Sequence, residues 1–144
     1  MTVIVVDASV LAVALSDDGP DGDASRAALA GDTLVAPELI DLEVLSVLRR
    51  QVQSGHVAVP RAELALSDLA ELPMRRAPHR PLLQRCWELR QAVTVYDAAY
   101  IALAEALGSV LITADARLSR APGIRCAVAP VSYTHLTLPT TPYV

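Results

Sequence analysis

The sequence contains no lysine, no asparagine and no phenylalanine, so arginine supplies all 12 of its Lys/Arg positions. The missing residues are those with AT-rich codons, which indicates a bacterial genome rich in G and C rather than a chemical constraint. The absence of lysine still has a chemical consequence, because it excludes every mechanism that needs a lysine side chain.

Cysteines and long apolar runs are also scarce. Cys86 and Cys126 match no metal-binding or redox spacing, which fits the reducing cytoplasm. No uninterrupted apolar stretch approaches the roughly 18 residues of a membrane span. The first basic residue, Arg26, comes too late for the positive region of a signal peptide. We therefore expect a cytoplasmic protein with no membrane association.

The length and charge of the chain limit its class. Its 144 residues are 53% hydrophobic, enough for one domain that buries a core without disulfide or metal support. The net charge of −4 argues against nonspecific nucleic-acid binding, which depends on Lys and Arg contacts to phosphate. If several acids belong to a cation site, however, the local field matters more than the net charge.

Short apolar runs alternate with helical patterns along the chain. Strands are expected at residues 3–6, 33–35, within 73–78, at 110–113 and at 124–128. Helices are expected at 8–15, 25–30, from Pro37 to about Ser54, and at 60–69, 81–91 and 96–107, with a loop at 16–23 and a helical turn at 115–118. Strands separated by helices predict an α/β fold with a parallel sheet covered on both faces.

Four acids stand where such a fold would bring them to one edge of the sheet. Asp7 ends the first apolar run and Asp115 follows the run at 110–112, so both lie at the carboxyl ends of strands, where parallel sheets bind ligands. Glu43 and Asp97 lie on helical patterns between them. Each acid alone is explained by helix capping or solvation. Four acids in apolar surroundings, however, repel one another unless a cation neutralises them, so the set predicts a Mg²⁺ or Mn²⁺ site.

Such a site has a definite chemistry. One or two divalent ions held by carboxylates polarise a phosphoryl oxygen, activate a water and stabilise the leaving oxygen. The hydroxyls of Ser9 and Thr113 lie beside the acids in the sequence and are candidates for orienting water or phosphate. Arg117 and Arg120 are candidates for contact with a polynucleotide backbone, with an exposed face as the alternative. The other paired arginines are expected on a solvated face or in a protein interface: Arg49, Arg50, Arg75 and Arg76.

The chain from Val131 onward differs from the rest in composition. It contains no Asp, Glu or Arg, and His135 is its one titratable imidazole. It also holds half of the tyrosines and half of the threonines of the whole chain. We therefore expect one domain at residues 1–130 and interpret residues 131–144 as non-native, from a cloning scar or an altered reading frame.

Four segments carry a family resemblance: Val5–Leu11, Ala36–Leu39 continued by Glu43–Arg50, Tyr96–Glu105 and Leu111–Leu118. In order and spacing, from about Val3 to Ala129, they resemble the PIN-domain family and, more narrowly, the VapC-type toxins of bacterial toxin–antitoxin pairs. The resemblance implies a three-layer α/β/α sandwich with a central parallel sheet. It also implies Mg²⁺- or Mn²⁺-dependent RNA cleavage, a homodimer, and inhibition by a VapB-like antitoxin.

The acidic quartet of that family falls on Asp7, Glu43, Asp97 and Asp115. One difference is Ser46, where many members have asparagine. We expect this difference to affect local helix packing or a contact to a metal-ligating residue. The four expected metal ligands are all present.

Two other interpretations stay open at this point. One is an aspartate-based phosphotransfer domain, a haloacid-dehalogenase-like phosphatase or a response-regulator receiver, with Asp7 as the phosphoryl acceptor. Both of those families use a lysine at the site, which this chain lacks. The phosphatases also require a second aspartate at the position of Ser9. The other is a non-catalytic PIN-like module that only binds a partner, against which the presence of all four acids argues. Dinucleotide binding is excluded because the sequence has no Gly-x-Gly-x-x-Gly turn.

Overall fold

The computed structural model describes residues 2–134, and within them five parallel strands form one sheet in the order β3-β2-β1-β4-β5. The strands are β1 (Val3–Val6), β2 (Thr33–Pro37), β3 (Arg75–Ala77), β4 (Val110–Thr113) and β5 (Val128–Pro130). Because β1 pairs with both β2 and β4, the strand order reverses between β1 and β4. In open α/β sheets, the crevice at this switch point is where ligands bind.

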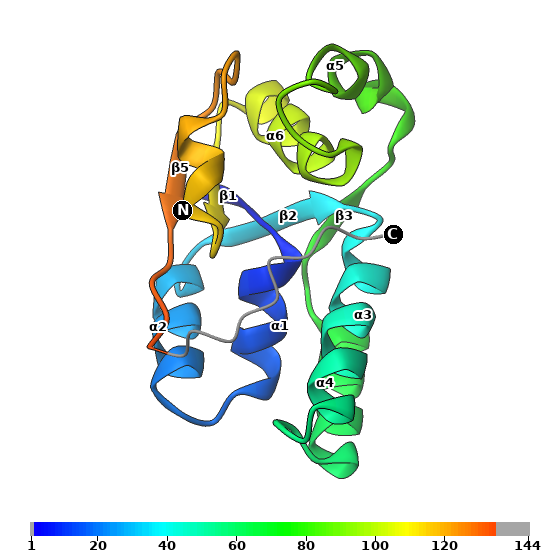
Figure 1. Ribbon diagram of the computed structural model, residues 1–144, viewed down its shortest axis with the longest axis vertical. Helices are drawn as coiled ribbons and strands as arrows, with labels where there is room; N and C mark the ends of the chain where they lie inside the picture. Colours follow the sequence, from blue (N-terminus) through cyan, green and yellow to red (C-terminus); the bar gives the residue numbers. More distant parts are fainter. Residues whose placement is uncertain (1, 135–144) are drawn as a thin grey trace.

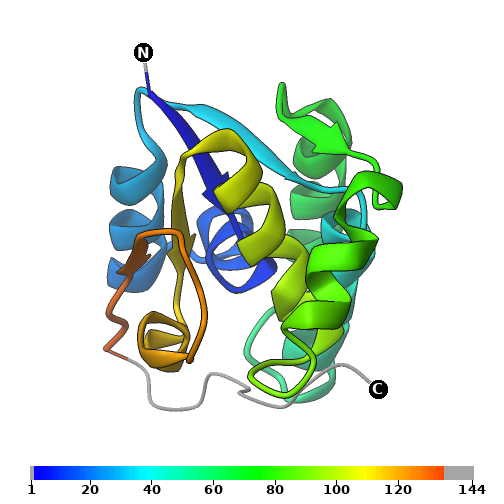
Figure 2. The same ribbon diagram turned by 90° about the horizontal axis from the view of Figure 1, so that it is seen from above.

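Helices cover both faces of the sheet. They are α1 (Ala8–Ser16), α2 (Pro20–Leu29), α3 (Ile40–Gln53), α4 (Val59–Glu71), α5 (Leu83–Glu88) and α6 (Val95–Leu107), with 3₁₀ turns η1 (Arg80–Leu82) and η2 (Ala116–Arg120). Figure 1 shows α5 and α6 on one side of the sheet and α1 to α4 on the other. Figure 2 looks onto the first of these faces, where α6 lies across β1. The predicted three-layer α/β/α sandwich is confirmed.

The core lies between the two central strands and the helices on either side. Val5, Val6 and Leu111 are 0% exposed, because parallel strands covered on both faces have no solvated side. Ala98 to Ala104 of α6 are all buried, so this helix is apolar on nearly every face. Truncating one of the large side chains here, such as Ile101→Ala, would cost about 2–5 kcal/mol of stability. No helix among residues 2–134 is long and apolar enough to cross a membrane.

Several predicted boundaries are wrong, and the helix predicted at 81–91 is the 3₁₀ turn η1 followed by α5, which ends at Glu88. The helix α2 begins at Pro20, inside the predicted loop, because proline is favourable in a first helical turn. Gly22 suggests a loop but lies within α2, where a Cβ would stand 1.8 Å from the backbone oxygen of Asp17. Pro37 ends β2 instead of opening α3. The last strand begins at Val128, and its proline is tolerated because β5 is an edge strand.

The chain around the predicted domain boundary contacts the body of the protein. The Val131 backbone N–H donates to the carbonyl oxygen of Thr113 at 2.7 Å, and the Tyr133 hydroxyl lies 2.6 Å from that of Ser25. The backbone N–H and hydroxyl of Thr134 donate to Asp21 Oδ1 at 2.8 and 2.9 Å. Residues 131–134 are thus fastened to β4 and α2. The non-native origin of residues 131–144 stays a prediction, and His135 lies outside the described residues.

Candidate active site

Each of the four acids lies at the start of a helix. Asp7 is the N-cap of α1 and accepts the backbone N–H of Ser9 at 3.0 Å. Asp115 is the N-cap of η2. Asp97 lies in the first turn of α6, and Glu43 lies in the first turn of α3. The positive partial charge of a helix N-terminus favours a carboxylate, so the chain can hold acids here at a reduced cost.

The charges of the four acids act on one another. Burial, followed by the charges of Asp7 and Asp115, raises the pKa of Asp97 to about 6. Burial, followed by the charges of Asp7 and Asp97, raises the pKa of Glu43 to about 7. Burial also raises the pKa of Asp7, which is 7% exposed. The structure therefore brings the quartet predicted from the sequence together at the carboxyl ends of β1 and β4.

Two hydroxyls fix the carboxylate of Asp7. Ser9 Oγ donates to one of its oxygens and Thr113 Oγ1 donates to the other, in short hydrogen bonds. Ser9 Oγ accepts from the backbone N–H of Ala114 at 3.1 Å, and Thr113 Oγ1 accepts from that of Asp115 at 3.0 Å. Ser9 and Thr113 thus connect Asp7 to the backbone that carries Asp115. Both hydroxyls lie against an acid, and their predicted role in orienting water or phosphate stays a prediction.

Glu43 has a partner that the sequence interpretation missed. Tyr100 Oη donates to Glu43 Oε1 at 2.5 Å, and both residues are at most 5% exposed. Tyr100 lies three residues after Asp97 on α6, so the two share a helix face, and this spacing was the available sequence signal. Glu43 Oε2 is buried without a hydrogen-bond partner among the described residues. A buried oxygen of this kind is costly unless a proton or cation satisfies it.

The side chains Arg117 and Arg120 lie near Asp115. Arg117 donates from Nε and Nη2 to the two Asp115 oxygens at 3.0 and 2.8 Å. This contact lowers the pKa of Asp115, and the charge of Arg120 adds to the effect. Arg117 is 67% exposed at its side chain, so it is placed at the surface beside the quartet. Contact of either arginine with RNA stays a prediction.

The donor set of the quartet fits a hard divalent cation. Carboxylate oxygens are the ligands that Mg²⁺ and Mn²⁺ prefer, and Glu43 Oε2 is an acceptor with nothing bound to it. Within residues 2–134, no three carboxylate, imidazole or thiolate side chains have the spacing to hold one metal ion as they stand. In this arrangement hydroxyls contact both Asp7 oxygens and Arg117 contacts both Asp115 oxygens.

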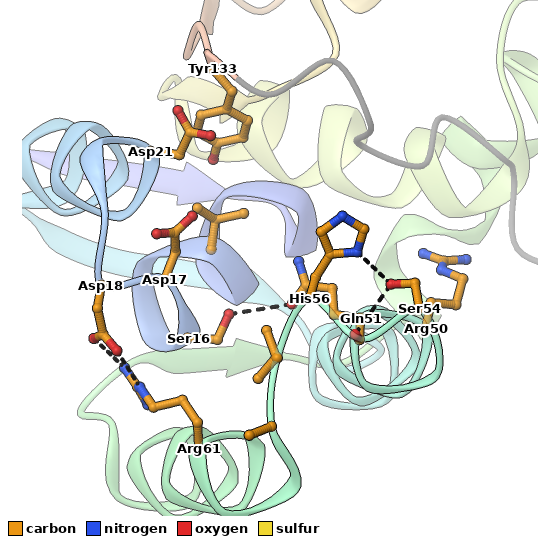
Figure 3. Close-up of a pocket in the computed structure, with 13 residues that line it drawn as sticks. Ser16, Asp17, Asp18, Asp21, Arg50, Gln51, Ser54, His56, Arg61 and Tyr133 are labelled. Atoms are coloured by element: carbon orange, nitrogen blue, oxygen red, sulfur yellow. Dashed lines mark hydrogen bonds and ion pairs between the residues drawn. The ribbon is translucent and has the colours of Figure 1, made fainter.

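A separate pocket of about 460 Å³ lies at the other ends of α1 and α3 (Figure 3). None of the four acids lines it. Asp17, Asp18 and Asp21 stand on the side of α1 and α2, whereas Arg50 and Arg61 come from α3 and α4. Asp18 and Arg61 pair across it, with Nε–Oδ2 and Nη2–Oδ1 distances of 3.0 and 3.1 Å. The pocket therefore has both acidic and basic residues in its lining and is distinct from the quartet.

Two solved structures share this fold. One is VapBC2 from Rickettsia felis, bound to a DNA fragment from their promoter, with a TM-score of 0.62 and 13% identity over 91% of this chain and 100% of that chain. The other is PAE2754 from Pyrobaculum aerophilum, with a TM-score of 0.55 and 24% identity over 88% of this chain and 92% of that chain. At these identities the likeness supports the fold alone.

Sequence comparison supports more than the fold. The PIN domain profile matches residues 4–124. Ribonuclease VapC1 of Mycobacterium tuberculosis is 42% identical over 125 residues, which cover 86% of this chain and 94% of the relative. Ribonuclease VapC9 of the same organism is 40% identical over 128 residues, which cover 89% and 98%. The chain belongs to the PIN-domain family, in its VapC ribonuclease branch.

Proposed function

We propose that this protein is a divalent-metal-dependent endoribonuclease that acts in the cytoplasm as the toxin of a toxin–antitoxin pair. The observation that carries the proposal is the convergence of four acids whose burial and mutual charge raise the pKa of Asp97 to about 6 and that of Glu43 to about 7. A bound cation would remove this repulsion. The names of the curated relatives, which are ribonucleases, support RNA as the substrate.

Asp7, Glu43, Asp97 and Asp115 would hold Mg²⁺ or Mn²⁺. The ion supplies Lewis-acid polarisation of the scissile phosphate and a more acidic bound water. Ser9 and Thr113 keep the Asp7 carboxylate in one orientation through their hydroxyls.

The Tyr100 hydroxyl donates to Glu43 Oε1, and Oε2 has no hydrogen-bond partner among residues 2–134. Because the pKa of Glu43 is about 7 without metal, a cation bound at Glu43 would displace a proton near neutral pH. Arg117 and Arg120 would place positive charge where the RNA backbone arrives.

Incubating the purified protein with total bacterial RNA, with and without Mg²⁺, and mapping the new RNA ends tests this function. We expect discrete cleavage sites that need the metal and disappear in Asp97→Asn. Cleavage that persists undiminished in excess EDTA would overturn metal dependence. The absence of new ends from a folded protein with bound metal would overturn ribonuclease activity itself.

We further propose a VapB-like antitoxin as the inhibitory partner. An arginine of the partner would match the planar geometry of a carboxylate pair in the quartet and exclude both metal and RNA. The rest of the partner would lie along the helices of residues 37–70, where Leu42 and Leu64 are 72% and 60% exposed. Expression of this chain alone should then arrest growth, and co-expression of the neighbouring gene should restore it. Arg→Ala variants of that partner should restore growth less well.

We also propose a homodimer. Several large apolar side chains stand at the surface, among them Leu42 of α3 and Leu83 and Trp87 of α5, which are 72%, 59% and 60% exposed. Burying such side chains in a second copy would remove apolar area from water. Sedimentation of the isolated protein checks this, with a monomer at micromolar concentration as the contrary result.

A non-catalytic PIN-like module is the second candidate function. The observation in its favour is that no three potential ligands among the described residues have metal-binding spacing as they stand. This candidate predicts a folded protein that binds its partner but cleaves no RNA in Mg²⁺ or Mn²⁺. The RNA-end mapping described above separates the two functions.

A further inference from the structure

The start of α3, which carries Glu43, lacks a cap of its own. Its N-cap residue is Leu39, whose side chain cannot accept a hydrogen bond from the first turn. His79, in the loop between β3 and η1, supplies the acceptor, since the Leu39 N–H donates to His79 Nε2 at 3.0 Å. The preceding N–H, of Glu38, donates to the carbonyl of Ala77 at 2.9 Å. The accepting nitrogen of His79 therefore carries no proton.

Arg76 holds the same turn from a second direction. The sequence predicts Arg76 on a solvated face or in a protein interface, whereas its side chain is only 23% exposed and contacts the protein's own α3 and α4. Its Nε lies 3.2 and 3.3 Å from the two oxygens of Asp41, and its Nη2 lies 3.0 Å from Oδ1. The same guanidinium donates to three carbonyls, those of Leu69, Leu72 and Met74, at 2.9, 3.1 and 3.1 Å. Arg76 thus connects the end of α4 to the first turn of α3.

The position of this turn determines where Glu43 lies. Glu43 follows Leu39 by one helical turn, and its N–H donates to the Leu39 carbonyl at 3.1 Å. It is 5% exposed and lies within the field of Asp7 and Asp97, whose negative charges repel it. An unanchored turn would relax away from these charges. A displacement of about 1 Å at a reacting group can lower a rate by about a hundredfold.

We propose that Arg76 and His79 are positioning residues that keep Glu43 in the acidic quartet by holding the first turn of α3. Neither needs to touch metal or RNA. The consequence for cleavage rests on the function proposed above, whereas the consequence for the geometry of α3 does not.

Hydrogen exchange in the metal-free protein without RNA tests the geometry. His79→Leu removes the acceptor, whereas His79→Gln keeps an acceptor oxygen near the position of Nε2. Arg76→Gln removes the guanidinium that contacts Asp41 and the end of α4. As a matched control, Arg75→Gln changes the exposed neighbouring arginine of the same strand. We expect amide exchange within residues 39–44 to rise at least about tenfold in His79→Leu and Arg76→Gln. In His79→Gln and Arg75→Gln it should stay within about twofold of wild type.

Cleavage kinetics test the consequence. We expect His79→Leu and Arg76→Gln to lower kcat about 10- to 100-fold with the KM for RNA nearly unchanged, and His79→Gln to recover most of the loss. Unchanged exchange in both variants would overturn the proposal, as would a rise that spreads equally over α6. If the exchange results hold but wild-type protein cleaves no RNA, the positioning stands and the nuclease function fails. If His79→Leu does not fold, Arg76→Gln compared with Arg75→Gln carries the same test.

Discussion

The pKa values of two glutamates, the buried Glu43 and the partly buried Glu105, shift in opposite directions. Burial raises the pKa of both, but Glu105 of α6 receives Arg85 Nε at 2.7 Å and the Arg125 N–H at 2.7 Å, and these contacts bring its pKa below the ordinary value. At Glu43 the hydrogen bond from Tyr100 lowers the pKa, but burial and the charges of Asp7 and Asp97 outweigh it and raise the pKa to about 7. The protein neutralises Glu105 with its own arginine and leaves the quartet short of positive charge. Under the proposed function, a cation from outside would complete such a site.

The largest expected effect is the loss of RNA cleavage when an acid of the quartet is replaced. Asp97→Asn removes one of the four carboxylates, so cleavage of RNA in Mg²⁺ should fall by at least about a thousandfold. Glu105→Gln, in contrast, should keep cleavage within a few-fold of wild type, because Glu105 lies outside the quartet. RNA-cleavage assays of the two variants at equal folded concentration measure this. Similar losses in both would mean that Asp97 acts only through the fold.

The next effect concerns stability, and its sign differs between the two glutamates. Glu43→Gln removes a repelled charge, so at pH 8 without metal the free energy of unfolding should rise by about 1–3 kcal/mol. Glu105→Gln removes the closer of the two charged partners of Arg85, the other being Glu88, so the same quantity should fall by about 1–3 kcal/mol. Urea denaturation in EDTA measures both. A Glu43→Gln protein that is less stable than wild type would assign Glu43 a structural role.

Stability should also depend on pH in a direction set by the quartet. Because the folded protein binds protons at Asp97 and Glu43 more tightly than the unfolded chain, their contribution is fully present below about pH 4 and is lost as pH rises through about 6 and 7. Without metal, stability should therefore fall by about 2–4 kcal/mol between pH 5 and pH 8. Mg²⁺ should restore much of this loss. Thermal melts in EDTA that are flat over this range would contradict the raised pKa values.

The smallest effect is expected from the end of the chain. Truncation after Val131 removes no member of the quartet, so cleavage should be unchanged. It does remove the contacts of Tyr133 with Ser25 and of Thr134 with Asp21. The melting temperature should therefore fall by only a few degrees, for a loss of about 1 kcal/mol. Loss of cleavage in a truncated protein that stays folded would show that residues beyond 131 support the site.

The sequence predicts those parts of the site that follow from strand ends. Asp7 and Asp115 follow the two most apolar runs, and in a parallel sheet such positions share one edge, so their meeting could be foreseen. Glu43 and Asp97 needed the family resemblance as well, because a helical pattern does not fix which face meets the sheet. The start of α2 was missed since a Gly-Pro-Asp-Gly sequence is typical of loops, whereas here Gly22 permits close packing on Asp17.

The contacts that hold the site could not be predicted in the same way. Arg76 reaches Asp41 across 35 residues and His79 reaches Leu39 across 40, and no local pattern records such tertiary contacts. An arginine pair in a proline-rich segment is usually solvated, so composition gave no indication that Arg76 makes tertiary contacts. Tyr100 was closer to prediction, because its spacing from Asp97 places both on one face of α6.

The central claim is that the quartet stays short of positive charge, although Arg117 pairs with Asp115, and that it binds a divalent cation to correct this. Calorimetric titration of the metal-free protein with Mn²⁺ at pH 6.5, in two buffers of different ionisation enthalpy, measures metal binding and proton release together. We predict saturable binding that releases a substantial fraction of a proton per ion, because cation binding displaces protons from Glu43 and Asp97. Binding should weaken at least about tenfold in Asp97→Asn and be unaffected in Glu105→Gln. No binding at millimolar Mn²⁺, or equal binding by wild type and Asp97→Asn, would contradict the account.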